Sequence, residues 1–191
     1  MNRRAPAILP IFRSPEQARI LTETFVFASG SMSLRELADR TGVSNSGVHK
    51  EVTRLEAAGL ITSQRVGRTR LVQADPNSPF HEDLRRLLTK AFGPPALLVE
   101  ALEPIPGIER AFIYGSWVAS QIASGDHAPR DIDVMVLGNP NIEEVYASVS
   151  EVETKVGRPI NVSVYTEADW AEDPTGFAAS VRTSPQHELL G

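Results

Sequence analysis

The sequence predicts an α+β protein built from two modules, and two patterns carry that prediction. The first 92 residues read as three short helices, a β-hairpin and a fourth helix, whereas residues 93–191 alternate helices and strands. The charge changes sign at the same place. Residues 1–92 hold 14 Lys and Arg against 9 Asp and Glu, and residues 93–191 hold 5 against 15. We therefore expect a basic N-terminal domain, residues 1–92, and an acidic C-terminal domain, residues 93–191.

Composition and length exclude several classes of protein. Hydrophobic residues make up 41% of the 191 residues and charged residues 23%, which is ordinary for a soluble domain and argues against global disorder. Because there is no Cys, a disulfide framework, a thiolate nucleophile and a Cys-ligated zinc site are all excluded. The apolar stretch at residues 7–12 is short and contains Pro10, so it predicts neither a membrane span nor a signal peptide. We expect a cytoplasmic protein.

Helix N-cap residues mark three helices in the first module. The serine residues that fit this role are Ser14, Ser33 and Ser44. Pro15 suits the first position of the first helix, which we expect to run to about Ala28. Glu36 completes a capping-box pattern for the second helix, which ends near Gly42. Gly59 is expected at the C′ position of the third helix.

The third helix is predicted to have two distinct faces. Its buried stripe consists of Val48, Val52 and Leu55. The other side is polar or cationic, and together with the cap its residues are Ser44, Asn45, Ser46, His49, Lys50, Thr53 and Arg54. Such groups contact the base edges and phosphates of double-stranded DNA. The second and third helices, joined by a short turn at residues 41–43, have the proportions of a helix-turn-helix.

A hairpin is expected next, from two β-like runs at residues 60–65 and 69–74 with Gly67 in the turn. Three arginines surround this turn: Arg65, Arg68 and Arg70. They suit a wing that lies along a DNA groove or the phosphate backbone. A further helix at residues 80–91 packs either on this module or at a dimer contact. Its apolar face consists of Phe80, Leu84, Leu87, Leu88 and Ala91.

The run from Leu34 to Ile61 resembles the winged-helix regulators of the ArsR/MarR type, and the similarity extends over about residues 14–75. Its ending, Arg-Leu-Glu-Ala-Ala-Gly-Leu-Ile at residues 54–61, is typical of that class. The resemblance implies a transcriptional regulator that binds a two-fold symmetric DNA site as a homodimer. Metal-sensing members use Cys or His ligands, and we expect no metal sensor because the histidines here are scattered. They are His49, His81, His127 and His187.

The second module is predicted from alternating apolar patterns. The expected helices are residues 95–102, 116–123 and 141–156, and the expected strands are residues 109–114, 132–137 and 159–165. The longest of these helices has a regular apolar stripe: Ile142, Val145, Val149, Val152 and Val156. The last 25 residues show no clear pattern. This alternation predicts an α/β or α+β sheet domain.

A pair of carboxylates marks a candidate ligand site in this module. Asp131 and Asp133 open the second strand, and side chains two residues apart lie on the same face of a strand. Such a pair suits Mg²⁺, which prefers oxygen ligands, and it would be catalytic in an active phosphoryl-transfer enzyme. Gly115 permits a tight turn after the first strand, where Ser116 and neighbouring backbone N–H groups suit a phosphate.

These residues resemble the minimal nucleotidyltransferases of the polymerase-β superfamily, over about residues 95–165. The residues that match the family motif are Gly115, Ser116, Asp131 and Asp133. The resemblance implies Mg²⁺ and a nucleotide triphosphate as ligands. Asn161 is the expected third nucleotide-binding position, where the family has a carboxylate, and Arg130 replaces a common Ser. We therefore expect a winged helix-turn-helix domain followed by a nucleotidyltransferase-like α/β sheet domain whose set of acids is incomplete.

Three functions remain open from the sequence. The first is a DNA-binding transcriptional regulator whose second domain binds a nucleotide or another ligand. The alternative is an active Mg²⁺-dependent nucleotidyltransferase that modifies a protein, an RNA or a small molecule. The third is an interaction module whose acidic surface masks a partner. Arg3 and Arg4 fit either a basic arm or a solvated terminus, and Arg158 fits either a phosphate ligand or a solvated side chain.

Overall fold

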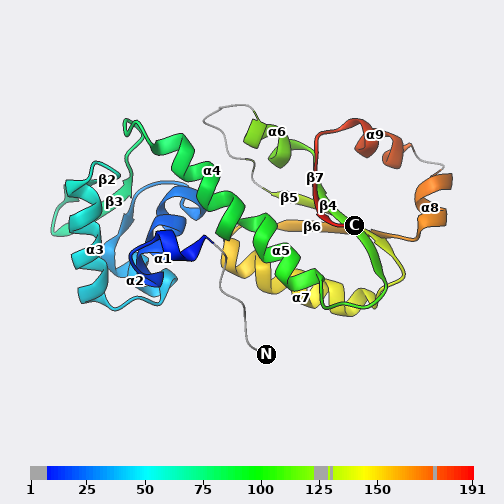
Figure 1. The fold of residues 1–191 in the computed structure, drawn as a ribbon, viewed down its shortest axis with the longest axis horizontal. Coiled ribbons are helices and arrows are strands. Elements are labelled where there is room, and N and C mark those ends of the chain that lie inside the picture. Colours follow the sequence, from blue (N-terminus) through cyan, green and yellow to red (C-terminus); the bar gives the residue numbers. More distant parts are fainter. Residues whose placement is uncertain (1–7, 123–128, 130, 174–175) are drawn as a thin grey trace. The chain divides into compact units, whose positions relative to one another are not determined.

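A computed structural model describes residues 8–122, 129, 131–173 and 176–191 of the chain (Figure 1). The chain divides into two compact units, Met1–Gly93 and Pro94–Gly191. Within the described ranges, no helix is both long and apolar enough to cross a membrane.

The first unit begins with helices whose start sites the serine caps predict. After a short 3-10 turn, η1 (Leu9–Ile11), its helices are α1 (Pro15–Thr22), α2 (Leu34–Thr41) and α3 (Asn45–Ala57). Ser14, Ser33 and Ser44 each accept a hydrogen bond from the backbone N–H three residues later, so all three predicted caps are confirmed. Gly59 takes a left-handed conformation with φ of 68° just beyond α3, as predicted.

The first helix differs from the prediction after Thr22. Residues Glu23–Phe27 continue the helix as a π-helix, η2, and Ala28 is extended, so the predicted end near Ala28 is confirmed but the last turn is not α-helical. Glu23 is buried at this change of geometry and pairs with Arg40 at 2.6 Å. Burial raises the pKa of the Glu23 carboxyl, and the Arg40 charge opposes this shift.

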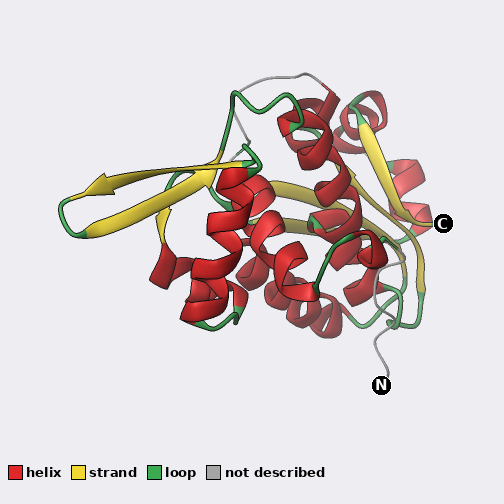
Figure 2. Ribbon diagram, turned by 60° about the vertical axis from the view of Figure 1, so that its left-hand side comes forward, coloured by secondary structure: helices red, strands yellow, loops and turns green. Residues whose placement is uncertain are grey.

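A three-stranded sheet completes the first unit in the order β1-β3-β2. Its strands are β1 (Met32–Ser33), β2 (Ile61–Val66) and β3 (Thr69–Ala74). Gly67 makes the turn between β2 and β3 with φ of 60°, which confirms the predicted hairpin. Figure 2 shows this hairpin projecting away from the helices of its own unit.

The core of the first unit joins α1, η2, α2, α3, the sheet and α4 (His81–Phe92). Leu88 on α4 is fully buried in this core, and Leu84 packs against it. The sequence predicts Phe80 on the same apolar face, but it is 59% exposed. The reason is that α4 begins one residue later, at His81, so Phe80 lies outside the helical periodicity.

The second unit contains the three helices and three strands predicted in its first part, followed by elements that the sequence does not predict. The first set is α5 (Pro94–Leu102), β4 (Ile108–Tyr114), α6 (Ser116–Ile122), β5 (Ile132–Gly138), α7 (Ile142–Val156) and β6 (Ile160–Tyr165). The second set is α8 (Glu167–Glu172), α9 (Phe177–Thr183) and β7 (Gln186–Leu190). The expected end of the helix at Ala123 lies outside the described residues.

Four strands form one mixed sheet in the order β6-β5-β4-β7, in which only β5 and β6 are parallel (Figure 1). One face packs on α8 and α9 through Phe112, Met135 and Trp170. The alternating residues on the other face, such as Val134 and Val136, are fully buried as well. The sheet is therefore covered on both faces over this region.

Helix α7 follows its predicted stripe except at its first residue. Val145, Val149, Val152 and Val156 are buried, whereas Ile142 is 53% exposed, so its predicted inward position is wrong. Ile142 is the first residue of the helix.

Candidate functional site

The turn between α2 and α3 places α3 at the surface of the first unit. Gly42 ends α2 in a left-handed conformation with φ of 65°, which residues with a Cβ rarely adopt. Val43 then turns inward and is buried, and Ser44 caps α3. Gly42, Val43 and Ser44 thus determine where α3 starts and which of its faces packs on the core.

The two faces of α3 are those that the sequence predicts. Val48, Val52 and Leu55 are buried. All seven predicted DNA-contacting positions of the helix and its cap are exposed: Ser44, Asn45, Ser46, His49, Lys50, Thr53 and Arg54. The structure therefore brings these polar side chains together on one solvent-facing surface.

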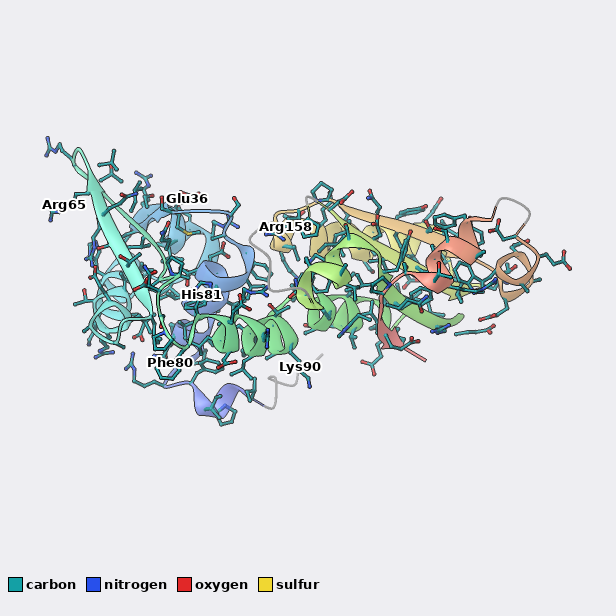
Figure 3. All side chains as sticks on the ribbon, turned by 90° about the horizontal axis from the view of Figure 1, so that it is seen from above. Glu36, Arg65, Phe80, His81, Lys90 and Arg158 are labelled. Atoms are coloured by element: carbon teal, nitrogen blue, oxygen red, sulfur yellow. The ribbon has the colours of Figure 1, made fainter. Side chains whose placement is uncertain are left out.

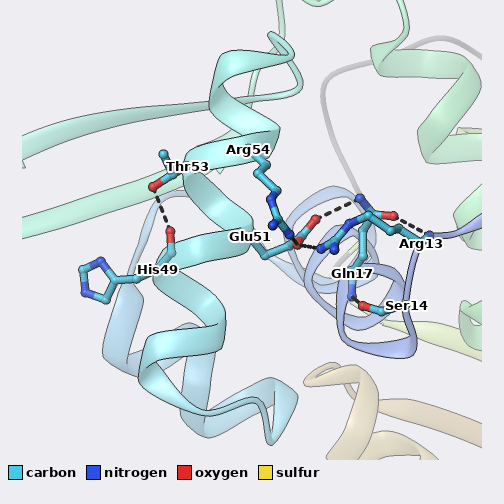
Figure 4. Close-up of polar contacts among 7 residues, drawn as sticks. All are labelled: Arg13, Ser14, Gln17, His49, Glu51, Thr53 and Arg54. Carbon is cyan, nitrogen blue, oxygen red and sulfur yellow. Dashed lines mark hydrogen bonds and ion pairs between the residues drawn. The ribbon is translucent and has the colours of Figure 1, made fainter.

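Some of these exposed groups already have partners within the unit (Figure 4). The Thr53 hydroxyl donates to the His49 carbonyl oxygen at 2.8 Å, so its proton is engaged by the helix itself. The Arg54 guanidinium lies 3.4 Å from the Glu51 carboxylate and keeps 46% of its side chain exposed. Figure 4 shows the His49 ring on one side of α3 and Glu51 directed toward Arg13 and Gln17 on the other.

A groove of about 650 Å³ lies between the start of α2, α3 and the hairpin. The residues that line it are Ser33, Leu34, Arg35, His49, Arg65, Arg68, Thr69 and Arg70. Four of these eight are arginines and none is acidic, so the groove is strongly positive. Arg35 is not among the site residues that the sequence predicts. Arg35 lies in the first turn of α2, and it joins the groove only because the hairpin folds beside it.

The three hairpin arginines have different surroundings. Arg65 and Arg68 are exposed, and Arg65 lies near the free end of the hairpin (Figure 3). Arg70 instead pairs with Glu56 of α3 and donates to the Ser63 hydroxyl at 3.2 Å. Arg65 and Arg70 are direct cross-strand partners. Like charges in that position destabilise a hairpin, and the Glu56 carboxylate offsets this repulsion by pairing with Arg70.

The predicted acid pair of the second unit is also brought together. Asn161 on β6 is the parallel partner of Asp133 on β5. The Asn161 amide nitrogen donates to Asp131 Oδ2 and to Asp133 Oδ1, both at 3.0 Å. The two carboxylates therefore converge on one point, and the neutral Asn161 side chain occupies it.

The turn after β4 lies against the same carboxylates. Gly115 has φ of 75°, and a Cβ at this position would be 3.5 Å from Asp133 Oδ2. Ser116 is exposed at the first position of α6. The phenol of Tyr114, which pairs with Asp133 across β4 and β5, has its pKa raised mainly by burial and further by the Asp133 charge, whereas a Ser163 hydrogen bond lowers it.

Five further residues that the sequence singles out cannot be assigned to either of these two surfaces. Arg3, Arg4, His127 and Arg130 lie outside the described residues. Arg158 is partly exposed, and burial lowers the pKa of its guanidinium. Across the part of the chain that is described, no three His, Asp or Glu side chains gather where they would hold a metal ion.

Comparison with known proteins identifies a family for part of the first unit. Residues 14–70 match the sequence model of the MarR family, a stretch that runs from the cap of α1 into β3. The match covers less than a third of the chain and does not reach the second unit. No curated protein was found to match the chain. Residues 14–70 are thus a MarR-type winged-helix region, and regulators of that family bind DNA.

Proposed function

We propose that this protein is a DNA-binding transcriptional regulator that contacts double-stranded DNA through α3 and the β2–β3 hairpin. The observation that carries the proposal is the arginine-lined groove beside the exposed polar face of α3. Phosphate neutralisation by arginine supplies most of the affinity of such a surface, and the polar face of a helix supplies sequence readout. The MarR family match over the same residues supports it.

The side chains divide into two roles in this proposal. Asn45 and Ser46 lie on the exposed first turn of α3, so they are the candidates for base contacts in the major groove. Lys50 and Arg54 on α3 and Arg65 and Arg68 on the hairpin are exposed cations and are the candidates for phosphate contacts. One short helix reads few base pairs, so we propose that a homodimer binds a two-fold symmetric site.

DNA binding by the full chain is testable with a fluorescent duplex of about 30 base pairs, roughly three helical turns. Binding is measured by anisotropy between about 50 and 200 mM salt. We expect Lys50→Ala and Arg54→Ala to flatten the dependence of log affinity on log salt by about 0.9 for each phosphate that the variant no longer neutralises. Lys155→Ala, which removes an exposed charge from α7, is the matched control. An unchanged salt slope in the α3 variants would remove Lys50 and Arg54 from the proposed DNA surface.

We further propose that the second unit is a degenerate nucleotidyltransferase-like domain that binds a nucleotide. Support comes from the β4–α6–β5–α7–β6 order and from the convergence of Asp131 and Asp133 beside the Gly115 turn. The two carboxylates fit Mg²⁺, which would supply positive charge to a bound triphosphate. Asn161 fits less well, because its amide offers one neutral oxygen and, as oriented, directs N–H groups at both acids.

The active-enzyme alternative separates from this proposal in one assay. The full chain is incubated with labelled ATP and Mg²⁺ and compared with Asp133→Ala. Nucleotide binding without label transfer is the expected result for a degenerate domain. Transfer of label that disappears in the variant would establish an active nucleotidyltransferase instead.

A further inference from the structure

A buried carboxylate lies in the middle of α3, where an apolar residue would be expected. Glu51 is 4% exposed and lies on the same side of the helix as Val48, Val52 and Leu55. Burying a carboxylate is costly unless charged and hydrogen-bonding partners surround it. The partners of Glu51 therefore indicate what this position does.

These partners come from two elements (Figure 4). Arg13, just before α1, pairs with Glu51 Oε2, and Arg54 lies 3.4 Å from the same oxygen. Gln17 of α1 donates from Nε2 to Glu51 Oε1 at 2.8 Å, and its own Oε1 accepts the Arg13 backbone N–H at 2.9 Å. Both carboxylate oxygens are thus engaged, and the cap residue Ser14 fixes the start of α1 beside them.

The charge of this cluster does not cancel. One carboxylate faces two guanidinium groups, so Arg13, Glu51 and Arg54 together carry one net positive charge. Glu51 is enclosed, whereas the side chains of Arg13 and Arg54 remain 53% and 46% exposed. Each guanidinium has five N–H donors, and the contacts to Glu51 use only some of them.

The cluster lies at one edge of the exposed face of α3. Arg54 is four residues after Lys50, so the two side chains lie on neighbouring turns of the same side. The hairpin borders the helix at the other edge, through the Arg70 and Glu56 pair. A DNA strand that crosses the exposed face thus passes the hairpin arginines on one side and Arg13 with Arg54 on the other.

We propose that Arg13 and Arg54, held in place by Glu51, form a phosphate-binding site for the DNA backbone on the edge of α3 away from the hairpin. The inference rests on the proposed DNA-binding function and adds Arg13, a residue outside the helix-turn-helix, as a DNA contact. Glu51 is a positioning residue that fixes the two guanidinium groups before DNA arrives. Fixing them in advance removes part of the side-chain entropy that binding would otherwise lose.

The test measures the salt dependence of binding to the same mixed-sequence duplex with the full chain. Arg13→Met is expected to reduce the log–log slope by about 0.9, the value for one phosphate contact. Arg13→Lys, which keeps the positive charge, is expected to have the slope of the wild type. Lys155→Met in the second unit removes the same charge and is expected to leave the slope unchanged. A purely structural role for Arg13 would lower the melting temperature without moving the slope.

A double-mutant cycle tests the positioning role of Glu51. In the Glu51→Gln background, Arg13→Met is expected to lose most of its effect on the slope, because the guanidinium is no longer held. An Arg13→Met slope equal to that of the wild type would overturn the site, and an undiminished effect in the Glu51→Gln background would overturn the positioning role. Failure of the wild-type chain to bind the duplex at low salt would instead overturn the proposed function itself.

Discussion

Replacing Asn161 by aspartate is the change that most sharply tests the geometry of the acid site. In the wild type, the Asn161 amide donates to Asp131 and Asp133 at 3.0 Å each. The Asn161→Asp variant loses both hydrogen bonds and places a third negative charge at the same point. We expect it to be less stable than the wild type in the absence of divalent cations.

The magnitude follows from the two interactions of the amide. Each missing hydrogen bond removes about 0.5–1.5 kcal/mol. Each new repulsion at about 3 Å adds about 1.4 kcal/mol in water, because these side chains are solvent-accessible. Side-chain rotation and salt screening relieve part of this sum, so we expect a net loss of about 2 kcal/mol. For a domain of this size that corresponds to a fall in Tm of roughly 8–16 °C.

The assay is thermal unfolding of the full chain with EDTA and then with Mg²⁺. We expect Mg²⁺ to restore most of the fall in Tm of Asn161→Asp, since three carboxylates then share the cation, and to have a smaller effect on the wild type. Asn161→Ala, which removes the hydrogen bonds without adding charge, is expected to fall less and to show no gain in Mg²⁺ response. Equal Tm values for Asn161→Asp and the wild type in EDTA would show that the Asn161 amide does not stabilise the two carboxylates.

Three further predictions concern both units. Burial raises the pKa of the Glu23 carboxyl, so the folded state binds its proton more readily than the unfolded state does. The contribution of Glu23 to the free energy of unfolding therefore falls as pH rises above about 4.5. Urea unfolding of Glu23→Gln should lack this part of the pH dependence. Gly138→Ala should destabilise the second unit by more than about 3 kcal/mol, since φ is 129° and a Cβ would lie 2.2 Å from a backbone oxygen. Gly176→Ala, at a position with no neighbouring atom near a Cβ, should cost about 1 kcal/mol when both variants are measured by thermal unfolding. Arg70→Ala should lower both Tm and DNA affinity, because Glu56 of α3 loses its cationic partner, although it keeps the hydrogen bond from Ser63. Arg68→Ala should lower DNA affinity alone, and equal melting temperatures for the two variants would contradict this difference.

Local signals in the sequence account for much of the first unit. Caps depend on residues three positions apart, and apolar stripes depend on a fixed period, so Ser44 and the stripe from Val48 to Leu55 are predictable. The same reasoning fails where an element begins. Phe80 and Ile142 continue an apolar period in the sequence, yet neither is buried, because Phe80 precedes the first residue of α4 and Ile142 is the first residue of α7.

Other features depend on tertiary structure and leave little trace in the sequence. Strand β1 has only two residues and exists because β3 lies beside it. Helices α8 and α9 are short, and aromatic contacts such as Trp170 on Phe112 hold them to the sheet. Glu51 is a charged residue beside the apolar stripe of α3, and its burial follows only from the packing of α1 on α3.

The candidate sites show the same division. The residue types at Asp131, Asp133 and Asn161 indicate a ligand site, and strand register brings them together. Arg13 and Arg35 have no motif of their own. Arg35 is a candidate because the hairpin folds beside it, and Arg13 is a candidate because it pairs with the buried Glu51 carboxylate.

Hydrogen–deuterium exchange of the full chain, with and without a saturating DNA duplex, tests directly whether α3 and the hairpin contact DNA. We expect DNA to slow exchange in Asn45–Ala57 of α3 and in the hairpin from Ile61 to Ala74. A stable DNA complex in which neither segment gains protection would contradict it.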